Sequence, residues 1–195
     1  MRKEEKEPPI RVLERYERVG DKHAWVERLL MDWGWGEPRE TFLGGAPDGS
    51  VVLPLLVNGN ILLVHQYRPF ADGWSYELPG GMIDEGESPE AAALRELKEE
   101  TGYEAREMRP LLTIYPHMTM SCKHHLFFAR RLEKGRTRRD RGERSMTTRE
   151  VSPTQLWEMI LDGTIQDAKT IITFFIAKER GLVTVDKRHL EAHPF

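Results

Sequence analysis

The chain of 195 residues is 39% hydrophobic and 31% charged, and its formal net charge is −3 at pH 7. This length and composition predict a globular protein with one medium domain, or one domain with a smaller accessory segment. The small net charge excludes a general attraction to nucleic acid or to a membrane surface, and no apolar run approaches the ~20 residues that a membrane span needs. The single cysteine, Cys122, excludes an internal disulfide framework and predicts a cytoplasmic location.

The first 45 residues are predicted to form a small antiparallel β segment ahead of a main domain at residues 46–195. Residues 1–9 are charged and end in two prolines, which indicates a loose tail. Residues 10–19 and 24–36 favour strands, although the second of these segments also fits a helical period.

Residues 50–70, "SVVLPLLVNGNILLVHQYRPF", contain two apolar, β-rich runs on either side of Asn58-Gly59-Asn60. An Asn-Gly pair between two such runs predicts a β-hairpin. Pro54 interrupts the first run and indicates a sheet edge or a bulge, because proline cannot donate a hydrogen bond to a neighbouring strand.

The later elements alternate irregularly between helix and strand. A helix is predicted between Ser88 as its N-cap and Gly102 as its end, with Pro89 in the first position. Two further helices follow: residues 152–163 open with the capping box Ser152 and Gln155, and residues 167–181 are amphipathic. Strands are predicted at residues 110–116 and 124–132, and the basic residues 130–145 are predicted to form a surface loop. The order favours an α+β fold with a mixed sheet and helices on its faces.

The helix after Ser88 carries an unusual group of like charges. At 100° per residue, Ala91, Leu94, Leu97 and Thr101 form a stripe predicted to pack on the sheet. Glu96, Glu99 and Glu100 share an arc on the other side and are predicted to face outward, with Arg95 within reach of Glu87 and Glu99. Such carboxylates suit Mg²⁺ or Mn²⁺. The alternative for glutamates on a helix is a solvated face with no ligand.

The spacing of these residues resembles the Nudix box. Gly81, five residues, Glu87, seven residues, and then "RELKEETGY" at 95–103 match its fixed positions. The resemblance implies a Nudix hydrolase, with an α/β/α sandwich fold, that cleaves a diphosphate with divalent cations. It also implies that Glu96 and Glu100 are the main metal ligands, that Glu99 and the Gly80 carbonyl assist them, and that Arg95 braces the catalytic glutamates.

The residues around the box resemble the branch that hydrolyses ADP-ribose and other nucleoside diphosphate sugars. The likeness includes "LLVHQYRPF" at 62–70, "YP" at 115–116 and "IQDAKTI" at 165–171. It implies that Arg68 contacts substrate phosphates, unless it is a surface ion-pairing arginine. It makes Glu77 a candidate for the substrate pocket, with support of the turn as the alternative role. It also implies a homodimer in which the partners exchange the N-terminal β segment.

Two departures leave the exact substrate open. Residues 117–125 read "HMTMSCKHH" where the branch often has Pro-Gly and an acidic residue, and the loop at 130–149 is rich in arginine instead of acidic residues. The alternatives are therefore a nucleotide-pool or RNA 5′-end pyrophosphatase, and a non-catalytic nucleotide-sugar sensor. In the resembled branch the general base often comes from the later loop, which makes Glu143 the preferred candidate; the rivals are Glu99 and Glu96.

Overall fold

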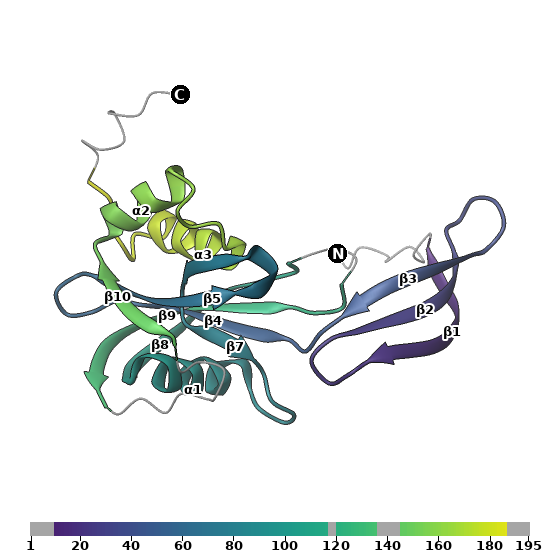
Figure 1. Ribbon diagram of the computed structural model, residues 1–195, viewed down its shortest axis with the longest axis horizontal. Helices are drawn as coiled ribbons and strands as arrows, with labels where there is room; N and C mark the ends of the chain where they lie inside the picture. Colours follow the sequence, from purple (N-terminus) through teal and green to yellow (C-terminus); the bar gives the residue numbers. More distant parts are fainter. Residues whose placement is uncertain (1–9, 117–119, 136–144, 187–195) are drawn as a thin grey trace, which may run out of the picture. The chain divides into compact units, whose positions relative to one another are not determined.

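The computed structural model describes residues 10–116, 120–135 and 145–186, which form two compact units. One unit contains the chain up to Pro47 with residues 120–122, and the other begins at Asp48 and includes the remaining described residues (Figure 1). No helix in these ranges is long and apolar enough to cross a membrane. The elements are β1 (Arg11–Gly20), β2 (Trp25–Asp32), β3 (Arg39–Gly45), β4 (Gly49–Pro54), β5 (Ile61–Arg68), the 3₁₀-helix η1 (Pro69–Ala71), β6 (Gly73–Glu77), β7 (Gly80–Met82), α1 (Pro89–Thr101), β8 (Tyr103–Ile114), β9 (His124–Lys134), β10 (Thr147–Val151), α2 (Pro153–Leu161) and α3 (Ala168–Glu179).

The first unit is an antiparallel sheet in the order β1-β2-β3, so the antiparallel β segment predicted at the N-terminus is confirmed and the helical alternative for β2 is wrong. Trp25 lies opposite Gly45, and its ring occupies the place where a side chain at Gly45 would project, 2.1 Å from the ideal Cβ position. The glycine is therefore needed for this cross-strand packing. Leu29 and Met31 are the buried apolar side chains of β2.

The second unit is built on a mixed four-stranded sheet in the order β7-β4-β9-β8, in which β4 and β9 are parallel and the other pairs are antiparallel. A separate antiparallel sheet has the order β10-β5-β6. Because side chains alternate along a strand, Val52 and Phe127 face α1, whereas Val51 and Leu53 face the core shared with α2 and α3. The four-stranded sheet thus lies between helices on both sides, which confirms the predicted α/β/α sandwich (Figure 1).

The hairpin predicted at residues 50–70 is wrong. The turn at Asn58–Asn60 forms, with the Leu56 N–H donating to the Asn60 carbonyl over 2.8 Å. Beyond a single bridge between Leu55 and Ile61, however, β4 and β5 separate into different sheets. The reason is nonlocal, because β4 pairs with β9 and β7 while β5 pairs with β10 and β6.

Pro54 ends β4, and its nitrogen faces a side where no strand of the described residues pairs with it. The Leu55 N–H bonds Ala129 in β9, and the Val52 N–H bonds Pro79 on the opposite side. Since successive N–H groups alternate, the Pro54 nitrogen faces the second side, where β7 pairs with β4 only as far as Val51. The missing donor therefore costs no ladder hydrogen bond.

The three predicted helices are confirmed, as are the N-caps predicted for α1 and α2. The Ser88 hydroxyl accepts from the Ala91 N–H, Ser152 and Gln155 form the capping box, and Gly102 ends α1 in the left-handed conformation. The loop predicted at residues 130–145 is wrong in part, because β9 continues to Lys134 by pairing with β8. Sequence analysis also missed β6, the short β7 and β10.

Candidate functional site

Helix α1 buries two of its glutamates, so the prediction of an outward acidic patch is wrong. Glu96 is 8% exposed and Glu100 is 3% exposed, whereas Ala91, predicted to pack on the sheet, is exposed. At 3.6 residues per turn, the buried residues cover about half of the helix circumference. This buried set consists of Ala92, Ala93, Glu96, Leu97, Glu100 and Thr101. The small side chains at 92 and 93 let the helix approach the sheet closely, and this approach carries the two carboxylates onto the glycine turn.

Strand β7, which receives these carboxylates, has no room for side chains at its two glycines. A Cβ on Gly81 would lie 2.2 Å from Oε1 of Glu96, and a Cβ on Gly80 would lie 2.3 Å from the backbone oxygen of Ser50. The Gly80 N–H donates to Oε2 of Glu100 over 2.9 Å. The glycines therefore allow the backbone of β7 to lie directly against both glutamates.

Arg95 ties the acidic residues of the turn and the helix together. Its Nε and Nη2 bond the two oxygens of Glu87 at 3.0 and 2.9 Å, and Nη1 bonds Glu96 at 2.8 Å and Glu99 at 3.2 Å. Nη2 also donates to the Met82 carbonyl over 2.9 Å. The hydrogen bonds with Glu87, and then those with Glu96, raise the pKa of Arg95, and the same contacts lower the pKa of Glu87. Arg95 is therefore a permanent cation that fixes the turn against α1.

A second bidentate pair joins β5 to β6. Arg68 Nε and Nη2 donate to the two oxygens of Glu77 over 2.7 and 2.6 Å, and the Glu77 side chain is only 6% exposed. The hydrogen bonds with Glu77 raise the pKa of Arg68, and the charges of Asp167 and Glu100 add to this effect. The guanidinium is therefore within electrostatic range of both α1 and the start of α3.

The N-terminus of α3 forms the opposite wall, which sequence analysis did not identify. Asp167 is the N-cap and accepts from Thr170 N and Oγ1 at 2.9 and 2.7 Å, and it also pairs with Lys169. Thr170 Oγ1 in turn accepts from the Leu78 N–H over 2.9 Å, which locks α3 to the strand end beside Glu77. Burial raises the pKa of Asp167, but the Lys169 charge and these hydrogen bonds outweigh it and hold the pKa below its usual value. The sequence signal that could have located this helix start is Asp167, an N-capping residue type three residues before Thr170.

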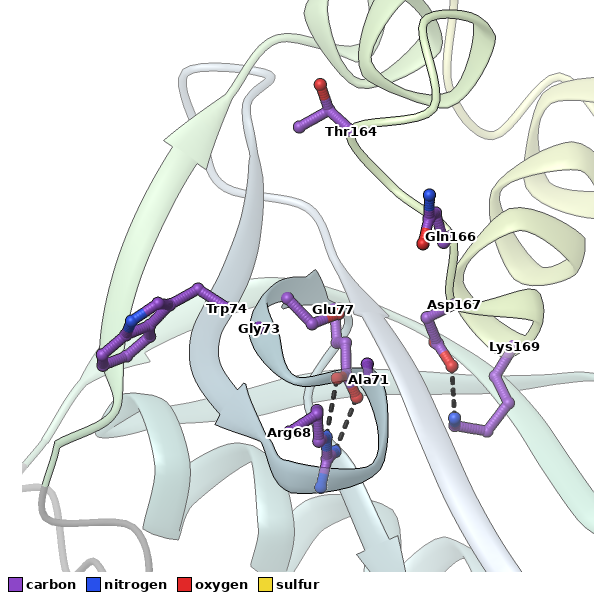
Figure 2. Close-up of a pocket in the computed structure, with 10 residues that line it drawn as sticks. Arg68, Ala71, Gly73, Trp74, Glu77, Thr164, Gln166, Asp167 and Lys169 are labelled. Atoms are coloured by element: carbon purple, nitrogen blue, oxygen red, sulfur yellow. Dashed lines mark hydrogen bonds and ion pairs between the residues drawn. The ribbon is translucent and has the colours of Figure 1, made fainter.

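A polar cavity of about 540 Å³ lies between these walls. Figure 2 shows Arg68 and Glu77 on the strand side, with Asp167 and Lys169 facing them from the helix side. The volume falls within the ~300–1,000 Å³ typical of small-molecule sites. The two walls come from segments about 90 residues apart in the chain, so the cavity exists only in the folded protein.

The remaining predicted site residue, Glu143, lies outside the described residues, as does Asp140 of the same loop. Glu133, which also lies in the predicted loop, pairs with Arg106 over 2.6 Å on the exposed surface of β8 and β9. Arg95 joins the box residues Glu87, Glu96 and Glu99, but the described ranges place no loop carboxylate beside them.

The donor set around α1 suits a divalent cation by its charge. In the described ranges no three Asp, Glu, His or Cys side chains converge closely enough to hold an ion, and in this conformation Glu96 and Glu99 both bind Arg95. Even so, five carboxylates gather here, at positions 77, 87, 96, 99 and 100, with Arg68 and Arg95 among them. Hard oxygen ligands of this kind fit a cation such as Mg²⁺ or Mn²⁺.

Comparisons with known proteins agree with this geometry. Residues 47–174, more than half of the chain, match the NUDIX domain. The chain is 38% identical over 123 residues to a CMP-5'-(N-acetyl-N-hydroxy-3-aminopropyl)phosphonate hydrolase of Streptomyces rubellomurinus, an overlap of 62% of this chain and 60% of that protein. It is 31% identical over 148 residues to an ADP-ribose pyrophosphatase of Bacillus subtilis, which covers 75% of this chain and 79% of that protein. A solved ADP compounds hydrolase shares the fold with a TM-score of 0.78 at 20% identity, covering 89% of this chain and 95% of that one.

Proposed function

The chain belongs to the Nudix family, and from that premise we propose that it hydrolyses a nucleoside diphosphate sugar, ADP-ribose or a similar compound. The products would be a nucleoside monophosphate and a sugar phosphate. The observation that carries the proposal is the carboxylate cluster of α1, with Glu96 and Glu100 buried, beside a polar cavity that holds Arg68. The ADP-ribose pyrophosphatase of Bacillus subtilis, matched over most of both chains, supports the substrate class.

The chain's own residues have separable roles in this reaction. Glu96 and Glu100 would hold the cation with help from Glu99 and the Gly80 carbonyl, and the Gly80 N–H orients Glu100 by its 2.9 Å hydrogen bond. Nudix hydrolases use a divalent ion, which we propose is Mg²⁺ or Mn²⁺ here. When bound, it neutralises charge on the phosphate oxygens and acidifies water. Arg95 keeps the glutamates in place.

Arg68 is proposed to contact the substrate phosphates. Its bonds to Glu77 use Nε and one N–H of Nη2. A guanidinium has five N–H donors, so three remain for a ligand. The side chain is 45% exposed, and Glu77 is nearly buried beneath it. Glu77 therefore fixes the orientation of Arg68 while leaving part of its fork accessible.

We retain Glu143 as the proposed general base. The variant Glu143→Gln should lower kcat by ~10²–10⁴-fold without changing the metal dependence, because proton abstraction and ion binding use different groups. A change in kcat of less than threefold would transfer this role to Glu99 or Glu96. Of these two, Glu99 is the more accessible, with its side chain 34% exposed.

A substrate panel tests the function itself. Purified protein is assayed with Mg²⁺ against ADP-ribose, GDP-mannose, UDP-glucose, ATP and 5′-capped RNA, with release of monophosphate as the readout. The proposal predicts turnover of at least one sugar diphosphate in preference to ATP and RNA. Preference for ATP or RNA would favour the nucleotide-pool or RNA 5′-end alternative, and binding without turnover would favour a sensor.

We also propose that the protein is a homodimer through its N-terminal sheet. The β1-β2-β3 sheet leaves large apolar side chains exposed, among them Val12, Leu13, Val19, Val26 and Phe42. Phe42 is 65% and Val19 is 66% exposed, and contiguous exposed apolar surface marks interaction sites. Light scattering at micromolar concentration should give the mass of a dimer, and Phe42→Ser should shift it toward the monomer. A fully active monomeric wild-type protein would contradict the proposal.

A further inference from the structure

The cavity between β5, β6 and the start of α3 carries charge that is already balanced. Its lining contains two cations, Arg68 and Lys169, and two anions, Glu77 and Asp167, and each cation pairs with an anion of the same wall. Three N–H donors of Arg68 remain for the substrate phosphates. Beyond these donors the lining carries no net charge, so the rest of the cavity favours an uncharged group.

The ion pairs retain hydrogen-bonding capacity on the cavity side. An ammonium group has three donors, and the pair with Asp167 uses one of those on Lys169, whose side chain is 30% exposed. Ser75 and Gln166 add a hydroxyl and an amide to the lining. Alternating donors and acceptors match hydroxyl groups, since each hydroxyl both donates and accepts. The chemistry of the cavity is therefore that of a polyol site.

A nucleobase fits the charged part of this cavity poorly. Trp74, the aromatic side chain in the lining, is 55% exposed and packs against His65 at a centroid distance of 5.0 Å and edge-on against Tyr67 at 6.0 Å. In Figure 2 its ring points away from Glu77, Asp167 and Lys169. Bases bind to proteins largely by stacking on aromatic faces, and the charged part of the cavity presents none among its described residues.

The cavity adjoins the carboxylate cluster. Glu77, in its lining, is separated from Gly80 by only two residues, and the Gly80 N–H bonds Glu100. On the opposite wall, the Thr170 hydroxyl accepts a hydrogen bond from the Leu78 N–H and donates one to Asp167. The charge of Glu100 also acts on Arg68 in the lining, so the cavity lies next to the proposed site of phosphorus attack.

We propose that this cavity binds the sugar half of the substrate as an uncharged polyol, and that Lys169, held by Asp167, determines specificity by donating to the sugar hydroxyls. The inference rests on the proposed function, since it assigns one half of the same substrate. It predicts selection for a sugar on the diphosphate, independently of which base the other half carries.

The first test uses the wild-type protein. The best sugar diphosphate of the panel is compared with the methyl ester of the same nucleoside diphosphate, which keeps the base and the diphosphate and lacks the sugar hydroxyls. Hydrogen bonds to charged groups are worth ~1.5–3 kcal/mol, so kcat/KM should be about 10- to 100-fold higher for the sugar ester. Equal values would overturn the inference and leave the proposed function intact. Turnover of neither ester would overturn both.

The second test assigns the effect to Lys169. Lys169→Met keeps the length of the stem and removes the donors. Lys169→Met should lower kcat/KM for the sugar ester about 10-fold or more, mainly through a higher KM. The same variant should change kcat/KM for the methyl ester less than threefold. Lys178→Met, at the other end of α3, is the matched control and should leave both unchanged. An equal loss on both esters in Lys169→Met would show a general structural role and overturn the assignment.

Discussion

The two glycines of the turn should respond differently to the same added methyl group. In Gly81→Ala, the new Cβ meets only the end of a flexible side chain, because Oε1 and Cδ of Glu96 lie 2.2 and 2.5 Å from its position. In Gly80→Ala, it meets fixed backbone instead, with the Ser50 oxygen at 2.3 Å and the Val51 Cα at 2.9 Å. The first variant should therefore lose function, and the second should lose stability.

The magnitudes follow from these distances. Ordinary contact begins at 3.4 Å, so the Glu96 carboxylate must move by about 1 Å or more in Gly81→Ala. A misplacement of this size can cost ~10²-fold in rate, which equals about 2.7 kcal/mol of activation free energy. In Gly80→Ala the strand β7 must move away from β4, and such overpacking typically costs ~1–3 kcal/mol of unfolding free energy.

Both quantities are measured on the same preparations. Urea unfolding gives the free energy of unfolding, and steady-state hydrolysis of the best sugar diphosphate with Mg²⁺ gives kcat/KM. Gly81→Ala should unfold within about 1 kcal/mol of wild type while losing ~10²-fold in kcat/KM. Activity within threefold of wild type in Gly81→Ala would refute the close approach of Glu96, as would a destabilisation equal to that of Gly80→Ala.

Two further changes test partly or fully buried polar residues of the second unit. Thr170→Val removes the hydroxyl that accepts from the buried Leu78 N–H, and urea unfolding should show a loss of ~1–3 kcal/mol; no loss would mean that another group satisfies this donor. Burial, with the nearby Lys169 charge, lowers the pKa of His124, and its Nδ1 has no hydrogen-bond partner among the described residues. The unfolded chain therefore takes up a proton at a higher pH than the folded chain, and stability should fall as pH drops below ~6.5. His124→Asn should flatten this dependence, and an identical pH profile would contradict it.

Local chemistry made the helices predictable. Ser88, Ser152 and Gly102 act within one turn of their own position, and so their signals in the sequence survive unchanged in the fold. The Asn58–Asn60 turn was equally local and also forms. The strands beside it were paired wrongly because β4 selects β9, more than 70 residues later, and no local pattern encodes that choice.

The orientation of α1 was mispredicted for a different reason. An apolar stripe locates the buried face only if buried residues are apolar, and α1 buries Glu96 and Glu100 with Leu97. The glycines at 80 and 81 make room for these carboxylates, so the error lies at the candidate functional site itself. The cavity could not be predicted from the sequence either, because only tertiary packing brings Lys169 and Arg68 into the same lining.

The central claim is that the buried glutamates of α1 bind a divalent ion for diphosphate hydrolysis, and Glu100→Gln tests it most directly. The amide oxygen can still accept from the Gly80 N–H, so the fold should remain, as thermal unfolding can verify. Replacing even an outer-shell partner of a metal costs ~10–100-fold. We therefore predict a loss of at least ~10²-fold in kcat for the sugar diphosphate across a Mg²⁺ titration, whereas Glu90→Gln, on the exposed first turn of α1, should stay within twofold of wild type. Mg²⁺-dependent turnover near the wild-type rate in Glu100→Gln would contradict the account.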